Sequence, residues 1–130
     1  MAKAPPRDPR GIDVRLARLV EADGVLGGLV ATRDGLPLAM HLGTTQDGEA
    51  LAAAAAGIGQ LAKDVLRRLD RGEMELGVID TSRFRLVIRP LSVGFLLVLA
   101  EPRASLDLIS HEMNAAAVAL DQAAGALAGS

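Results

Sequence analysis

The stretch Thr32-Arg33-Asp34-Gly35-Leu36-Pro37-Leu38-Ala39 decides how the first half of this chain folds. It lies between two short runs of apolar residues. An Asp-Gly pair between such runs predicts a β-hairpin, because glycine readily adopts the positive φ that a tight turn requires. We therefore expect two antiparallel strands, over residues 25–32 and 36–42, on either side of this turn.

Hydrophobic periodicity and turn residues predict the remaining elements. Asp8-Pro9 is typical of a helix start, with the acid at the N-cap and proline at the first helical position. We expect Gly24 to end that helix in the left-handed conformation. After the hairpin we expect a helix over residues 48–69, strands over 74–80, 84–91 and 94–100, and a final helix capped by Ser105.

Length and composition exclude several classes of function. The 130 residues fit one domain, with residues 1–7 as a flexible tail and 8–130 as the folded part. Phe84 and Phe95 are the only aromatic residues and the formal net charge is −2, so the chain lacks both the stacking platforms and the basic excess of a nucleic-acid binder. There is no cysteine and no apolar run near the roughly 18 residues of a membrane span. We therefore expect a cytoplasmic protein without membrane insertion.

The short motifs of the chain do not predict a catalytic centre. Residues 57–62, Gly-Ile-Gly-Gln-Leu-Ala, match a dinucleotide-binding pattern, but they lie inside an expected helix and not at a strand-to-helix turn. His111-Glu112 begins like a zinc-peptidase helix, yet residue 115 is Ala where the second His is required. We expect no bound cofactor, no metal and no enzymatic activity.

The helix expected over residues 48–69 has an unusual second side. Its large apolar residues form a stripe that predicts burial against a sheet, and the stripe includes Leu61, Val65 and Leu69. The other side has small residues where a solvated face normally carries Lys and Glu. These residues are Ala52, Ala53, Ala56 and Gly59. We interpret this side as a contact with a second copy in a dimer; the alternative is an alanine run that only reflects helix propensity.

The order of the expected elements, with RDGLPLA in the first hairpin, resembles the Roadblock/dynein-light-chain family. The resemblance extends over about residues 8–127 and includes the segments 47–52, 86–90 and 101–106. It implies an α+β fold in the order α-β-β-α-β-β-β-α. This fold is a three-layer α/β/α sandwich, in which a five-stranded antiparallel sheet has the long helix on one face and the two terminal helices on the other.

Members of this family typically dimerise by pairing their third strands edge to edge and their central helices against each other. Carried onto this chain, the resemblance implies a homodimer with Met74, Leu76 and Val78 at the pairing edge. The small-residue side of the long helix would then meet its own copy.

Bacterial members of the family resemble a gliding-motility protein that activates a Ras-like GTPase by reordering its switch regions. The resemblance therefore implies a homodimeric regulator of a small Ras-like GTPase, and specifically a GTPase-activating protein. The implied partner contacts are Gln60, Lys63, Asp64 and Arg67, without an arginine finger. Two alternatives remain: a scaffold or adaptor that leaves the GTPase rate unchanged, and a small-ligand sensor, which requires a pocket of roughly 300 Å³ with convergent polar groups.

Overall fold

The structure of the chain is a computed structural model that describes residues 11–44 and 46–129, with side chains up to residue 122. The proposed tail and the Asp8-Pro9 helix start lie outside these residues. The helices are α1 (Ile12–Leu19), α2 (Gly48–Leu69) and α3 (Leu106–Gly129). The strands are β1 (Val25–Thr32), β2 (Pro37–His41), β3 (Gly77–Asp80), β4 (Arg85–Leu91) and β5 (Gly94–Ala100). The predicted order of elements is confirmed.

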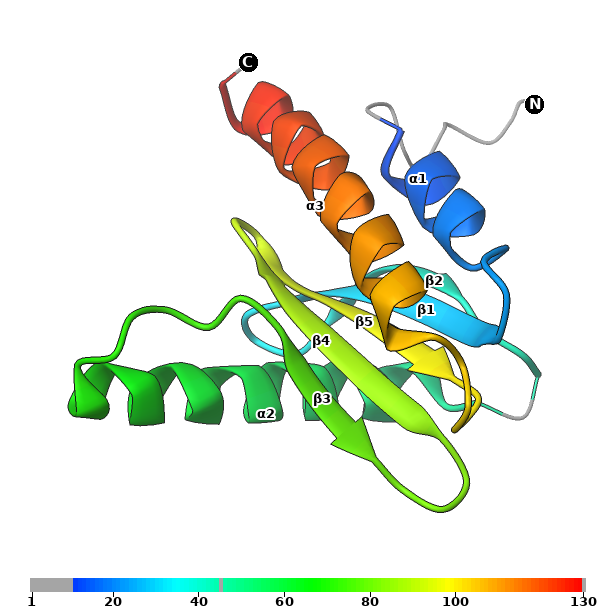
Figure 1. Cartoon of the computed structure of the whole chain (residues 1–130). Coiled ribbons are helices and arrows are strands. Elements are labelled where there is room, and N and C mark those ends of the chain that lie inside the picture. The colour runs from blue at the N-terminus through cyan, green and yellow to red at the C-terminus, as the bar shows by residue number, and fades with distance from the viewer. Residues whose placement is uncertain (1–10, 45, 130) are drawn as a thin grey trace.

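The five strands form one antiparallel sheet in the order β2-β1-β5-β4-β3. β5 lies at its centre and is buried along its whole length. α2 crosses one face of the sheet, while α1 and α3 cover the other (Figure 1). The predicted α/β/α sandwich is therefore confirmed, and β2 and β3 are its two edge strands.

The first hairpin forms as the Asp-Gly pair predicts. Gly35 has a φ of +90°, and its N–H donates to the Thr32 carbonyl at 3.0 Å. The Thr32 N–H in turn donates to the Leu36 carbonyl at 2.8 Å. This turn places Arg33 beside the turn between β4 and β5, where it contributes to the site described below.

The sheet separates two hydrophobic cores. On one face, Leu16 and Leu19 of α1 and Met113 of α3 share a core with Val30, Val87 and Val98 of the sheet. On the other face, Phe95 and Ile88 lie beneath α2. Because the two cores are separate, the rotation of α2 about its own axis determines only which residues are exposed on the α2 side of the sheet.

The rotation of α2 differs from the prediction. Ala52 and Ala56 are only 0% and 5% exposed and lie against the sheet with Gly59, whereas Leu61 is 65% exposed. The prediction that this small-residue side faces a second copy is wrong for these three residues; only Ala53 is exposed. The reason is volume: the sheet face below α2 already carries large side chains, so the helix contributes small ones.

α1 and β3 are markedly shorter than predicted. α1 begins at Ile12 after Gly11, which has a φ of +85°, and it ends at Leu19 and not at Gly24. β3 begins at Gly77 because Met74 and Leu76 turn inward, one onto each hydrophobic core. The segment between α2 and β3 thus packs against both cores at the edge of the sheet.

Candidate functional site: two surfaces beside α2

An apolar groove of about 460 Å³ lies between the second half of α2 and the edge strand β3. Large apolar side chains of α2 are unusually open here, with Leu61 65%, Val65 45% and Leu69 59% exposed. The groove is lined by Ile58, Leu61, Ala62, Val65, Leu66, Met74, Leu76, Gly77, Val78, Ile79 and Ile88. Because apolar side chains of this size normally avoid water, this groove is a candidate protein contact.

The groove brings together one part of the predicted dimer interface. Met74, Leu76 and Val78 line it, but Met74 and Leu76 precede β3, so Val78 alone of the three lies on the edge strand. The register places Val78 opposite Val87 on the α1/α3 side and Ile79 opposite Leu86 on the α2 side. Ile79 is therefore the β3 residue that shares a face with α2, and the prediction missed it. The alternation of strand residues could have revealed it once the face of one β3 residue was fixed.

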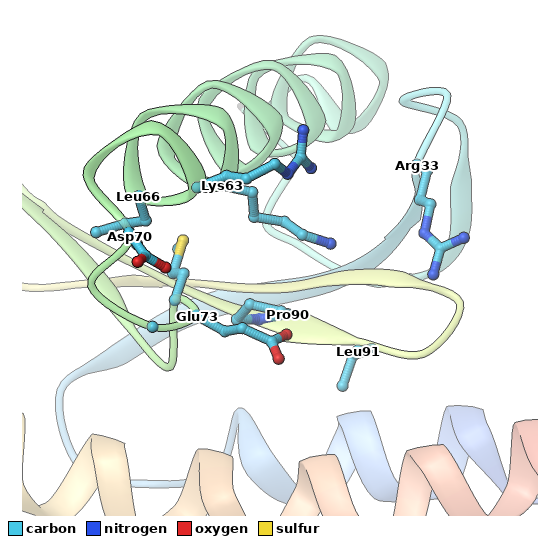
Figure 2. A pocket seen from close by; sticks show the side chains of 10 residues that line it. Arg33, Lys63, Leu66, Asp70, Glu73, Pro90 and Leu91 are labelled. Carbon is cyan, nitrogen blue, oxygen red and sulfur yellow. The ribbon is translucent and has the colours of Figure 1, made fainter.

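A charged cleft of about 520 Å³ lies on the opposite flank of α2 (Figure 2). It is bounded by the end of α2, the segment before β3, the end of β4 and the first hairpin. Its lining residues are Arg33, Lys63, Leu66, Arg67, Asp70, Gly72, Glu73, Met74, Pro90 and Leu91. Two of the predicted partner-binding residues, Lys63 and Arg67, are thus in one cleft.

The cations of this cleft differ in their contacts. Arg67 Nη1 lies 3.3 Å from Asp64 Oδ1, and both side chains are more than half exposed, at 75% and 53%. Lys63 Nζ instead lies over the Phe95 ring, 5.9 Å from its centroid, and the residue is half-buried. Arg33 Nη2 donates to the Ser92 carbonyl at 3.0 Å. Sequence reasoning missed Arg33 as a site residue because it lies 30 positions before Lys63, and only the hairpin brings it to the cleft.

The cleft meets the size and polarity that a small-ligand sensor would require. Its form is less suitable, because Arg67, Asp70 and Glu73 are exposed side chains on one rim. Small-molecule sites usually enclose most of the surface of their ligand. An open cleft with charged rims and an apolar floor is better suited to a segment of another protein.

The profile of the Roadblock/LC7 domain matches residues 12–101, from the start of α1 to just beyond β5. The chain belongs to the Roadblock/LC7 family. A sequence relative, the uncharacterized protein MJ0310 of Methanocaldococcus jannaschii, is 28% identical over 106 residues, which cover 82% of this chain and 93% of the relative.

Solved structures of MglB share this Roadblock fold. MglB from Myxococcus xanthus matches with a TM-score of 0.85 at 16% identity, over 98% of this chain and 96% of that chain. The gliding protein MglB from Thermus thermophilus matches with a TM-score of 0.79 at 18% identity, over 96% of each chain. An MglB structure with a tetrameric arrangement matches with a TM-score of 0.80 at 18% identity, over 96% of this chain and 95% of that chain. At such identities the likeness is one of fold.

The remaining sequence motifs have structural positions in the Roadblock fold. The glycine pattern at residues 57–62 lies in the middle of α2, and Gly59 contacts Phe95 there. His41 Nε2 lies 3.1 Å from Asp13 Oδ1, and this contact connects β2 to α1. His111 is exposed on α3. Within residues 11–44 and 46–129, no group of three His, Asp or Glu side chains lies close enough to hold a metal ion. No helix of that part of the chain is long and apolar enough to cross a membrane.

Proposed function

We propose that this Roadblock chain forms a homodimer through the apolar groove. Leu61 and Val65 leave a large apolar surface uncovered in the single chain, and β3 leaves one side of the sheet without a neighbouring strand. A second copy related by a two-fold axis would cover both features in one contact. The tetrameric arrangement of one MglB structure supports self-association of this fold.

We propose further that the dimer regulates a small Ras-like GTPase in the cytoplasm. The family resemblance implies this role, and the likeness to MglB along almost the entire chain supports it. The observation that carries the proposal is the charged flank of α2, where Lys63 and Arg67 line an open cleft. The groove and the cleft share Leu66 and Met74 but otherwise have different lining residues, so in the proposed dimer the second copy covers the groove while the charged rim of the cleft stays open to the GTPase.

The proposed mechanism is complementarity with the nucleotide-dependent switch regions of the GTPase. A surface that binds the catalytically competent arrangement of those regions more tightly raises its population. The GTPase then hydrolyses GTP with its own residues, and this chain contributes no catalytic group. Arg67 has the role of a contact residue here, because Asp64 already engages its guanidinium.

The test is a pull-down from native lysate with the tagged chain as bait, with a non-hydrolysable GTP analogue in one arm and GDP in the other. We expect the bait to retain a Ras-like GTPase only in the presence of the GTP analogue. We also expect the GTPase to hydrolyse GTP faster when it is mixed with the purified chain. Retention in both arms, or recovery of other partners only, would favour the scaffold. As matched baits, Arg67→Glu tests the charged flank and Arg103→Glu reverses an exposed charge outside both surfaces.

A further inference from the structure

Two cations from distant parts of the chain meet at one side of the charged cleft. Lys63 extends from α2 toward the hairpin from which Arg33 descends, as Figure 2 shows. The hairpin and α2 hold a fixed relationship because Gly35 packs against α2; a Cβ at position 35 would lie 3.2 Å from the Ala53 Cα. The two positive charges are therefore held on opposite walls of the same opening.

Both side chains are oriented by contacts that leave their charges uncompensated. The Ser92 carbonyl accepts one hydrogen bond from Arg33, and the Phe95 ring supports the Lys63 ammonium by a cation–π contact. Among the described residues, neither cation lies within 4.0 Å of a carboxylate oxygen. Arg67 and Arg85, by contrast, each have an aspartate partner. Two oriented, unneutralised cations form a site that favours an anion.

The rest of the cleft indicates what kind of group carries that anion. Leu66, Pro90 and Leu91 provide apolar surface between the walls. Asp70 lies on the far side of Lys63 from Arg33, and the Glu73 carboxylate lies below Lys63, beside Pro90 (Figure 2). An anion such as free phosphate would leave both the apolar surface and the acidic end unused. A short protein segment with an acidic residue, apolar residues and then a basic residue matches all three parts.

We propose that Arg33 and Lys63 bind a carboxylate side chain of the partner protein, with a basic residue of the same segment at Asp70 and Glu73. This inference rests on the proposed function, in which the partner is the Ras-like GTPase. It adds Arg33 to the contact surface and assigns a chemical class to the group that Lys63 binds. Arg67, which already pairs with Asp64, contributes less.

The first experiment measures binding of the recovered GTPase, loaded with the GTP analogue, by calorimetry at low and high salt. Arg33→Glu and Lys63→Glu should each raise the dissociation constant at least tenfold. Higher salt should also raise the dissociation constant of the wild type. Arg68→Glu and Arg71→Glu are matched controls, since both residues are exposed and lie outside the cleft; their effect should be below threefold. Lys63→Gln, which keeps much of the packing on Phe95, separates loss of charge from loss of folding.

Equal effects of the cleft variants and the controls would overturn the inference while leaving the GTPase proposal intact. If the wild-type chain binds no GTPase, the proposed function fails, and a peptide titration followed by NMR still decides the inference. The probe is acetyl-Glu-Leu-Leu-Lys-amide, and its comparison is the same peptide with Gln in place of Glu. With the Glu peptide we expect chemical-shift changes at the Arg33 Nε–H and the Lys63 amide. The affinity obtained from the titration should be at least threefold weaker with the Gln peptide or with the Lys63→Gln variant. Equal binding of both peptides, binding of neither, or equal binding of free glutamate would contradict a carboxylate-bearing segment.

Discussion

Gly59 of α2 lies directly against the ring of Phe95 on β5. A Cβ atom at position 59 would clash with Phe95 Cε1, and the Phe95 side chain is fully buried. This contact sets how closely α2 approaches the sheet. It also fixes the rotation of the helix, because the glycine side must face the ring, and Leu61 is consequently turned outward.

Replacing Gly59 with Ala should destabilise the chain. The Phe95 ring is fully buried, so the added methyl group forces α2 or the ring to shift, at a cost of about 1–3 kcal/mol. Gly57→Ala is the matched control in the same helix, since no described atom outside its own helical backbone lies within 4 Å of its Cβ position. That variant should gain about 0.5–1 kcal/mol from helix propensity. Urea denaturation measures both, and a neutral Gly59→Ala would contradict the close packing.

Charge in the apolar groove should prevent self-association without unfolding the chain. Leu61→Glu and Val65→Glu alter side chains that are largely exposed in the single chain, so its own core loses little. In a dimer the same carboxylates would be buried without partners, which is strongly unfavourable. Val118→Glu is the control, because Val118 is 56% exposed on α3 at the other face of the sheet.

The molar mass from light scattering separates these outcomes. The wild type and Val118→Glu should have the mass of a dimer, and the two groove variants that of a monomer, all with the same circular dichroism spectrum. A monomeric wild type at micromolar concentration would contradict the proposed dimer. A dimer that survives both groove substitutions would move the interface elsewhere.

How far the sequence predicts this structure can be judged from α2 and the hairpin. Local signals suffice for the turn at Asp34-Gly35 and for the bounds of α2, since turn residues and caps act within a few positions. The rotation of α2 depends on Phe95, which lies 36 positions after Gly59, and no helical pattern contains that information. A helix with alanine on one side and leucine on the other has two apolar sides, and only the bulk of the opposing sheet decides between them. For the same reason Arg33, a hairpin residue, could not be assigned to the cleft from local spacing.

Loss of the N-cap of α2 should have a smaller, local effect. The Asp47 side chain accepts a hydrogen bond from the Ala50 N–H at 3.1 Å, which satisfies a donor that the first turn of a helix leaves without a backbone acceptor. Asp47→Ala should therefore cost about 1 kcal/mol. Thr44→Ala, in the preceding loop, is the control and should stay within about 0.5 kcal/mol of the wild type. Thermal unfolding measures both variants, and equal melting temperatures would show that the cap is dispensable.

The Asp80–Arg85 pair should make stability depend on pH in the acid range. Arg85 Nε donates to Asp80 Oδ1 at 2.6 Å, and this hydrogen bond lowers the pKa of Asp80 below its ordinary value. A carboxyl group with a lowered pKa in the folded state stabilises it above the unfolded pKa of about 3.9, and the stabilisation is lost as the pH falls through the folded value. Asp80→Asn should thus lower the urea midpoint by a constant amount from pH 7 to pH 5. Below about pH 4 the difference should shrink, because the carboxyl of the unfolded wild type is then protonated, and the folded wild type follows as the pH falls through its lowered pKa. The same comparison in an Arg85→Gln background should show a much smaller acid-dependent difference. A difference between wild type and Asp80→Asn that persists unchanged to pH 3 would show that the aspartate acts through packing and not through its charge.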